Sequence, residues 1–278
     1  MKKLCLLAAL CGLTTTLLAA GPEWKLVWAE EFNQPGLPDP SRWDYETGFV
    51  RNGELQYYTR ARKENVRIEN GHLILEAIKE KYPNPAYKAD GRKEDSKRSR
   101  EFAEYTSGSI TTKGKVTWQY GRIEAMAKIP KGRGMWPAIW MLGDKSDGKG
   151  WPACGEIDIM EYVGHEPAVA HGTVHTEKFN HIKKTQKGST VKVPGLEDAF
   201  HLYAIEWTPK EISFFVDDKK YYTFANDGTG DAAWPFDKPF YIILNVAVGG
   251  AWGGAKGVDA TIFPQRMEVD YVRVYQQK

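Results

Sequence analysis

The sequence predicts an all-β protein, folded as a β-sandwich or barrel in a single domain. Many short runs alternate between apolar and polar residues, and glycine-rich turns separate these runs. Such alternation is typical of strands, because successive side chains of a strand point to opposite faces of a sheet. No long amphipathic helical pattern, fixed-period repeat or low-complexity linker is found in residues 21–278. We therefore predict one domain over this range.

Thirteen runs predict strands, each by its alternation or by β-branched and aromatic residues. Asn70-Gly71 lies between the second and third runs, which is a strong signal for a tight β-hairpin. Residues 52–59 are polar and aromatic without clear periodicity and are compatible with a surface loop. The predicted strands cover residues 24–28, 66–69, 72–77, 109–113, 120–129, 136–142, 155–162, 169–175, 205–207, 212–216, 221–224, 240–248 and 268–275.

Residues 79–100 are strongly charged and contain Pro83 and Pro85. This composition predicts a long, mobile surface loop. The basic residues within 88–100 are expected to be solvated, and contact with an acidic substrate is the alternative.

Residues 1–20 resemble a secretory signal peptide. Met1-Lys2-Lys3 is basic, an apolar run follows from Leu4 to Leu13, and the segment ends with small residues at Ala20. We therefore predict that the protein is exported to the periplasm or the extracellular space.

Two of the cysteines, Cys5 and Cys11, lie within this segment, so the mature chain would keep only Cys154 and no internal disulfide. Leu10 is bulky for lipoprotein processing at Cys11, and a lipid anchor is therefore the less favoured prediction. The formal net charge of +2 gives no electrostatic reason to bind nucleic acid. No later stretch is long enough to predict a membrane span, and we expect a monomer.

The run 155–162 carries three carboxylates, Glu156, Asp158 and Glu161, separated by apolar residues. In a regular strand Glu156 and Asp158 share one face, whereas Glu161 would point into the core beside the isoleucines. An unpaired carboxylate there would be costly. One extra residue after Asp158, a β-bulge, returns Glu161 to the polar face.

Three acids on one face repel each other and separate their pKa values. This is the arrangement that two carboxylates need to act as nucleophile and general acid. An amphipathic strand with an ordinary polar face and an acidic calcium site remain alternatives from the spacing alone. A serine hydrolase is disfavoured, because no G-x-S-x-G motif is present.

Three histidines, His165, His171 and His175, lie close together in the sequence. Pro167 after His165-Glu166 does not fit the helical H-E-x-x-H zinc motif. His171 and His175 are expected on one face of a strand, with one of them in a polar cleft near the acids. We expect no cofactor for catalysis.

The acidic run resembles the bulged E-x-D-x-x-E signature of glycoside hydrolase family 16, in its laminarinase-like form. Further blocks resemble that family in the same order, and the similarity covers nearly all of residues 21–278. The matching blocks are residues 31–32, 52–59, 120–124, 136–142, 171–175, 244–250 and 269–275.

This resemblance implies a β-jelly-roll sandwich of two antiparallel sheets with a concave substrate groove. It also implies retaining hydrolysis, with Glu156 as the nucleophile and Glu161 as the acid/base. Asp158 would orient and tune this pair. The implied substrate is β-1,3-glucan (laminarin), with mixed β-1,3/1,4-glucan as a further substrate. The alternatives are the same chemistry on a marine galactan (agar, porphyran or carrageenan) and a non-catalytic β-glucan-binding protein.

By the same resemblance, Trp136, Trp140 and Trp252 are candidate platforms for sugar rings. Asn52 and His175 are candidate hydrogen-bonding residues along the cleft. The family often has arginine where this chain has Met126, and asparagine where it has Ala251, which leaves the sugar contacts less defined.

Many relatives also carry a structural calcium ion on the convex side. The matching positions here are Glu31, a carbonyl near Gly71, and Asp270. Oxygen ligands suit calcium, so a structural calcium site is predicted at these positions.

Overall fold

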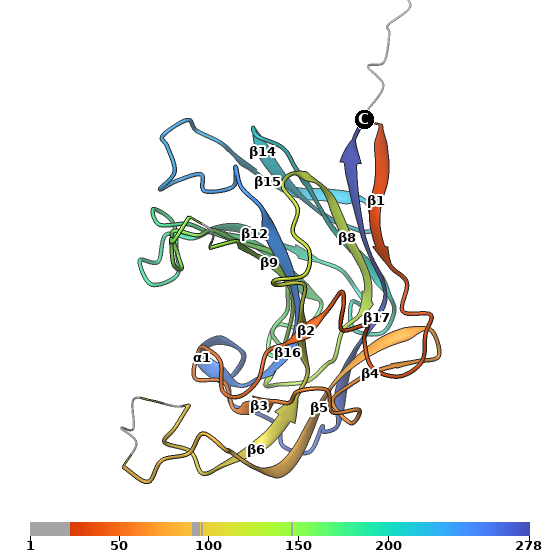
Figure 1. Ribbon diagram of the computed structural model, residues 1–278, viewed down its shortest axis with the longest axis vertical. Coiled ribbons are helices and arrows are strands. Elements are labelled where there is room, and N and C mark those ends of the chain that lie inside the picture. The colour runs from red at the N-terminus through yellow and green to blue at the C-terminus, as the bar shows by residue number, and fades with distance from the viewer. Residues whose placement is uncertain (1–22, 91–94, 96, 146) are drawn as a thin grey trace, which may run out of the picture.

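Two facing β-sheets make up most of the molecule (Figure 1). The computed structural model describes residues 23–90, 95, 97–145 and 147–278, so the predicted signal peptide 1–20 lies outside the described residues. Among the residues described, no helix has the length and apolar character needed to cross a bilayer. The all-β sandwich that the sequence predicts is confirmed.

A seven-stranded sheet carries the acidic strand near its middle. Its strands are, in spatial order, β12 (Lys187–Lys192), β11 (Val169–His175), β10 (Glu156–Glu161), β9 (Met135–Gly143), β16 (Phe240–Val248), β7 (Ser109–Thr111) and β2 (Asp44–Tyr45).

A ten-stranded sheet packs behind it. Its main path is β15 (Lys219–Ala225), β14 (Glu211–Val216), β13 (His201–Trp207), β8 (Gly121–Lys128), β17 (Gln265–Gln277), β5 (His72–Pro83), β6 (Phe102–Ser107) and β3 (Gln56–Tyr58). Beside this path, β1 (Trp24–Glu30) pairs with β17, and β4 (Val66–Glu69) pairs with β5.

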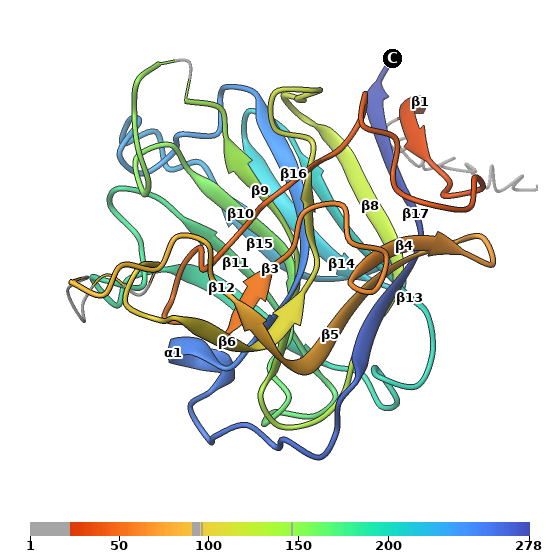
Figure 2. The same cartoon turned by 60° about the horizontal axis from the view of Figure 1, so that its bottom comes forward.

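Neighbouring strands run antiparallel, with the exception of β3 and β6, which pair in parallel (Figure 2). The predicted hairpin is confirmed, since β4 and β5 pair across Asn70-Gly71. Both turn residues have positive φ, 54° and 79°, which is the geometry that favours Asn-Gly. A single helical turn, α1 (Gly250–Gly253), follows β16.

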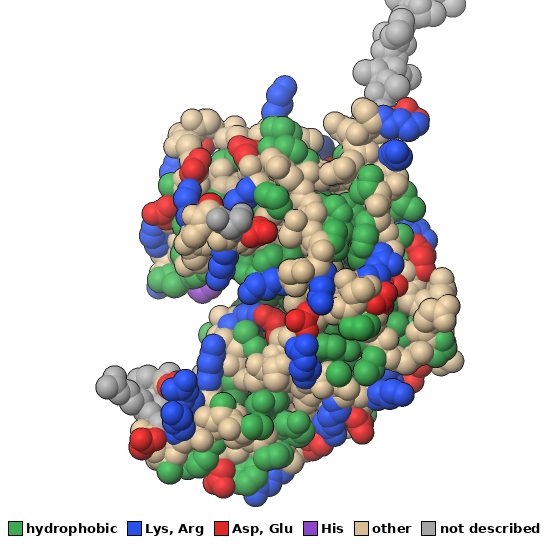
Figure 3. Space-filling view, in the orientation of Figure 1, with side chains coloured by type: hydrophobic (Ala, Val, Ile, Leu, Met, Phe, Trp, Pro, Cys, Tyr) green, Lys and Arg blue, Asp and Glu red, His purple; other side chains and the backbone are tan. Residues whose placement is uncertain are grey.

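The hydrophobic core lies between the two sheets, and alternation along strands such as β9 decides which side chains enter it. In β9, Ile139 and Met141 join the core, whereas Trp136 and Trp140 belong to small clusters on the opposite face. That opposite face is concave, and its surface is hollowed in the space-filling view, with charged side chains at the bottom of the hollow (Figure 3). The alternation therefore positions the candidate site.

Two predictions made for loops are wrong. Residues 56–58 form the buried strand β3, because their backbone pairs with the distant β6. The predicted loop 79–100 begins too early, because β5 continues to Pro83 against the same strand. Arg100 is not simply solvated, since its guanidinium donates a 2.8 Å hydrogen bond to the main-chain oxygen of Glu54.

Candidate active site

The acidic strand β10 contains the predicted bulge. Against β11, Asp158 pairs with Thr173 and Glu161 pairs with His171, so the β10 side has one extra residue. The register against β9 shifts at the same place. Ile159 and Met160 both enter the core, and Glu161 returns to the concave face beside Glu156 and Asp158. The irregularity is what places all three carboxylates on one side of the strand.

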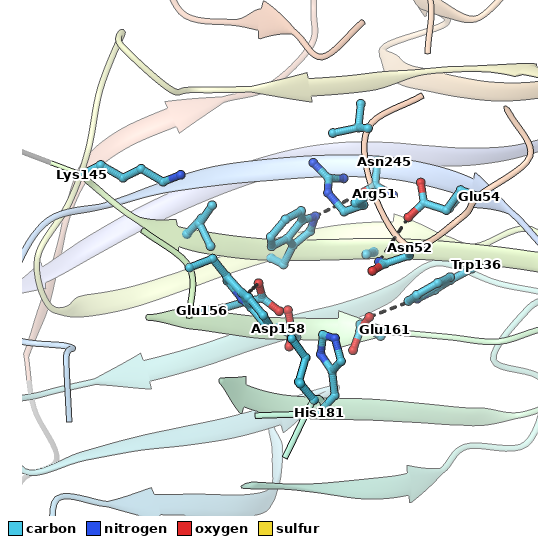
Figure 4. A pocket seen from close by; sticks show the side chains of 17 residues that line it. Arg51, Asn52, Glu54, Trp136, Lys145, Glu156, Asp158, Glu161, His181 and Asn245 are labelled. Carbon is cyan, nitrogen blue, oxygen red and sulfur yellow. Dashed lines mark hydrogen bonds between the residues drawn. The ribbon is translucent and has the colours of Figure 1, made fainter. Parts of the chain in front are cut away.

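These carboxylates lie in a cleft of about 520 Å³ on the concave face (Figure 4). Its walls come from β9, β10, β16 and the segments around residues 50–54 and 181–182. The lining residues are Val50, Arg51, Asn52, Glu54, Trp136, Ala138, Trp140, Leu142, Lys145, Trp151, Glu156, Asp158, Glu161, His181, Ile182, Asn245 and Ala247. A second hollow continues the cleft over β11 and β12 and adds His171, His175 and Trp252.

Glu156 is held by aromatic side chains. The indole Nε1 of Trp151 donates a 2.9 Å hydrogen bond to its Oε2. The Trp151 ring packs against His181, with ring centroids 5.0 Å apart. Nε2 of His175 lies 3.7 Å from the other oxygen, Oε1. Trp151 and His175 therefore fix the direction in which this carboxylate faces the cleft.

Glu161 is held in a similar way on the other side of the bulge. Nε1 of Trp136 donates a 3.0 Å hydrogen bond to its Oε1. The Trp136 ring meets Trp252 edge to face at 5.6 Å, and Trp252 in turn meets His171 at 4.8 Å. The predicted platforms Trp136 and Trp252 are thus in contact with each other, beside the carboxylate predicted to be the acid/base.

Asp158 lies between the two glutamates and is only 3% exposed. Its Oδ2 is buried without a hydrogen-bond partner, and Nε2 of His175 lies 3.4 Å away. Ligand atoms of Asp158, Glu156 and His175 come within 4.8 Å of one another. Trp151 N–H occupies one Glu156 oxygen, and the other oxygen faces His175.

Burial raises the pKa of every carboxyl group in the cluster. It raises the pKa of Glu156 to about 8, with the charge of Glu161 as the next cause. It raises the pKa of Glu161 to about 7, against the Trp136 hydrogen bond, which lowers it. Burial, and then the charge on Glu156, raise the pKa of Asp158 well above its usual range. Asp158 therefore holds its proton more tightly than a free carboxyl group does, and the two glutamates titrate as a coupled pair near neutral pH.

His175 is neutral at neutral pH, because burial, and then the neighbouring His181, lower its pKa to about 4. A neutral imidazole adds no positive charge beside the three acids. The predictions that His171 and His175 share a face and that one of them lies beside the acids are confirmed.

The opposite wall of the cleft holds the remaining predicted contacts. Nε1 of Trp140 donates to Oδ1 of Asn245 at 2.8 Å, and the guanidinium of Arg51 lies 4.9 Å from the centroid of the Trp140 ring. Asn52 is exposed and donates through Nδ2 to Oε1 of Glu54 at 3.3 Å. All five predicted sugar contacts therefore line the cleft or its continuation.

Sequence reasoning missed several residues of the site. Asn245 could have been found, because it is a polar residue inside the otherwise apolar run of β16. Glu54 lies within a block that resembled the family, but its lack of periodicity gave it no role. Trp151 follows a glycine- and charge-rich loop, and no sequence signal connects it to Glu156.

The predicted calcium residues lie at one corner of the ten-stranded sheet, because β1 and β5 both pair with β17 there. Both carboxylate oxygens of Glu31 accept hydrogen bonds from Arg273, at 2.8 and 2.9 Å. Oδ1 of Asp270 lies 3.8 Å from Nε2 of His72. The carboxylate of Asp270 and main-chain carbonyls are thus the ligands that remain for a cation.

Comparisons with known proteins agree with this geometry. A β-glucanase from Rhodothermus marinus is 52% identical over 263 residues, which cover 91% of this chain and 86% of that protein. The X-ray structure of the laminarinase from Rhodothermus marinus superposes with a TM-score of 0.83 at 50% identity, covering 93% of this chain and 100% of that chain. SCLam, a non-specific endo-β-1,3(4)-glucanase, superposes with a TM-score of 0.82 at 48% identity over 94% of both chains.

The family model for glycosyl hydrolases family 16 matches residues 54–273, which include the whole of β10. This chain therefore belongs to glycoside hydrolase family 16, on its laminarinase-like branch, and is a glycoside hydrolase.

Proposed function

We propose that this protein is an endo-acting, retaining hydrolase of β-1,3-glucan that also cuts mixed β-1,3/1,4-glucan. The observation that carries the proposal is the bulged strand, which presents Glu156, Asp158 and Glu161 to one cleft. Two tryptophan N–H groups orient the outer carboxylates, and indole and aliphatic walls suit the faces of neutral sugar rings. The relatives named above act on these glucans.

Double displacement follows from the environments of the two glutamates. Glu161 gives its proton to the leaving glycosidic oxygen while the carboxylate of Glu156 attacks the anomeric carbon and forms the glycosyl-enzyme. Glu161, now ionised, then removes a proton from water, whose oxygen bonds to the anomeric carbon as the ester bond to Glu156 breaks. Asp158 stays protonated and, together with Trp151, stabilises the charge on Glu156 before the attack.

The pH dependence of kcat/KM is expected to be bell-shaped, with its basic limb near neutral pH. The active form needs Glu161 protonated, and burial raises the pKa of this group to about 7. Because the two glutamates titrate as one coupled pair, the active form is the singly protonated pair with its proton on Glu161. Activity is therefore lost on the basic side as this last proton leaves, and on the acid side as the pair takes up a second proton. Initial rates on laminarin between pH 4 and 9 would measure both limbs. A rate that keeps rising above pH 8 would contradict the role of Glu161.

The substrate is tested by incubating residues 21–278 with laminarin, barley mixed-linkage glucan, carboxymethyl-cellulose, agarose and porphyran. Products are identified by mass and linkage. We expect laminari-oligosaccharides from laminarin, and products from barley glucan define the breadth. Cleavage of agarose or porphyran alone would keep the mechanism and overturn the substrate. No product from any of them would overturn the glucanase proposal.

We also propose a structural calcium ion bound by the carboxylate of Asp270 and by main-chain carbonyls of Glu31 and Gly71. Such hard oxygen ligands suit calcium, and a ligand that binds only the folded state raises its stability. Calcium is expected to raise Tm by a few degrees relative to EDTA, and Asp270→Ala is expected to remove this difference. An equal Tm with and without calcium in the native chain would refute the site.

Export of a monomer completes the proposal. It is supported by the resemblance of residues 1–20 to a signal peptide. Fractionation of expressing cells and size-exclusion chromatography with light scattering would test location and oligomeric state. A protein that stays in the cytoplasm with residues 1–20 attached, or that forms a stable dimer, would contradict this proposal.

A further inference from the structure

Glu54 is a fourth carboxylate of the cleft, and the mechanism above gives it no role. It is 4% exposed and lines the same cleft as Glu161. Its backbone is fixed from two sides, because Arg100 donates to its main-chain oxygen at 2.8 Å and the next residue, Leu55, donates to the main-chain oxygen of Val248 at 2.9 Å. The backbone that carries this side chain is therefore held in place by the fold.

Both oxygens of Glu54 accept hydrogen bonds from side-chain amides. Nε2 of Gln56 donates to Oε2 at 2.6 Å, and Nδ2 of Asn52 donates to Oε1 at 3.3 Å. The direction of the first bond is set by the backbone. The main-chain N–H of Val248 can only donate, and it donates to Oε1 of Gln56 at 2.7 Å. Gln56 must then turn its NH₂ group toward Glu54.

Glu54 in turn fixes the orientation of the Asn52 amide. An ionised carboxylate only accepts hydrogen bonds, so Asn52 must also turn its NH₂ group toward Glu54. Oδ1 of Asn52 is left on the other side of the amide. Asn52 is exposed and lines both hollows of the cleft, and Figure 4 shows it between Glu54 and Trp136.

We propose that Glu54 is a positioning residue that fixes the amide of Asn52 with its carbonyl oxygen toward the cleft, where it accepts a hydrogen bond from a sugar hydroxyl. The inference rests on the proposed function, since it assigns this contact to a neutral glucan. It also predicts selectivity. A sulfate ester at this place has no hydrogen to donate and would face both the carbonyl oxygen and the Glu54 charge, so sulfated galactans are disfavoured.

The same charge acts on Glu161. Burial is the main cause of the raised pKa of Glu161, and Glu54 raises it further. Burial also raises the pKa of Glu54 itself, and the charge of Arg51 and the two amide donors offset only part of this rise. The other groups that face Glu161 are Trp136 on β9, His171 on β11, and the carboxylates of its own strand. Removal of the Glu54 charge should therefore move the basic limb of activity to lower pH.

The test uses Glu54→Gln, Asn52→Asp and the double variant, with kcat and KM measured on laminarin. In Glu54→Gln the new NH₂ group faces Asn52, whose amide flips and presents a donor to the cleft. KM is expected to rise about fivefold, the cost of one neutral hydrogen bond, and the basic limb moves to lower pH. In Asn52→Asp two carboxylates face each other, and KM also rises.

The double variant is the decisive test, because the NH₂ group introduced by Glu54→Gln can donate to the carboxylate introduced by Asn52→Asp and leave an acceptor oxygen toward the cleft. KM should return to within about twofold of the native value, so the two single effects are not additive. Glu104→Gln, at an exposed position of β6, is the matched control and should change neither KM nor the pH profile. An unchanged KM in Glu54→Gln, or a double variant worse than both single variants, would overturn the proposal.

A second readout does not depend on activity. In Asn52→Asp, repulsion from Glu54 should lower Tm more at pH 8 than at pH 5, measured against the native chain at each pH. Equal losses would contradict the proposal even where Glu54→Gln fails to fold. A native chain that cuts no laminarin would overturn the proposed function. The Tm comparison would still test the contact between Asn52 and Glu54.

Discussion

Glu156→Gln is expected to lower kcat on laminarin by about 10⁴-fold or more, because the amide cannot form the glycosyl-enzyme. Glutamine has nearly the same shape and can still meet Nε1 of Trp151 through its carbonyl oxygen. Binding of laminari-oligosaccharides should therefore stay within about threefold of the native affinity, as measured by calorimetry. Loss of turnover with binding retained is the result that separates a catalyst from a glucan-binding protein.

Chemical rescue tests the nucleophile more directly. Glu156→Ala opens space at the anomeric carbon, and azide added to an activated glycoside should form a glycosyl azide of inverted configuration. Glu211→Gln, at the exposed first residue of β14, is the control and should keep full activity. If Glu156→Gln retained a tenth of the native kcat, another group would have to be the nucleophile.

The catalytic strand shows how far sequence reasoning reaches. Strict alternation would bury Glu161, and the cost of that burial was enough to predict the bulge that the register contains. Only local information is needed for this bulge, since the burial cost of each residue of β10 depends on its own chemistry. The same holds for Trp136 and Trp140, whose spacing puts them on one face.

Contacts between distant segments could not be predicted in this way. Residues 56–58 are buried because they pair with β6, more than forty residues later. Trp151 donates to Glu156 from a loop whose path depends on the whole sheet. Glu54 depends on Gln56, Val248 and Arg100, and no periodicity in its own segment indicates them. The catalytic carboxylates could therefore be predicted from their own strand. The residues that orient them could not, because they come from distant segments.

Glu161→Gln is expected to lower kcat on laminarin by about 10³-fold, because a glucose leaving group needs a proton that the amide cannot supply. The effect should depend on the leaving group. In an aryl β-glucoside with an acidic phenol, the phenolate leaves without protonation. Formation of the glycosyl-enzyme should therefore persist and appear as a burst of phenol. A defect of equal size on both substrates would show that Glu161 acts through structure and does not transfer the proton.

The same variant is expected to be more stable than the native chain at high pH. Burial raises the pKa of Glu161 from 4.5 to about 7 in the folded state, so the folded state binds more protons than the unfolded state between these values. The native chain therefore loses stability as pH rises through this window, by about 3 kcal/mol when Glu161 is fully ionised. Glutamine does not ionise and avoids this loss. Melting curves should thus show Glu161→Gln several degrees above the native chain at pH 8 and close to it at pH 4. A variant less stable than the native chain at pH 8 would mean that the ionised carboxylate is better solvated in the cleft than its burial implies.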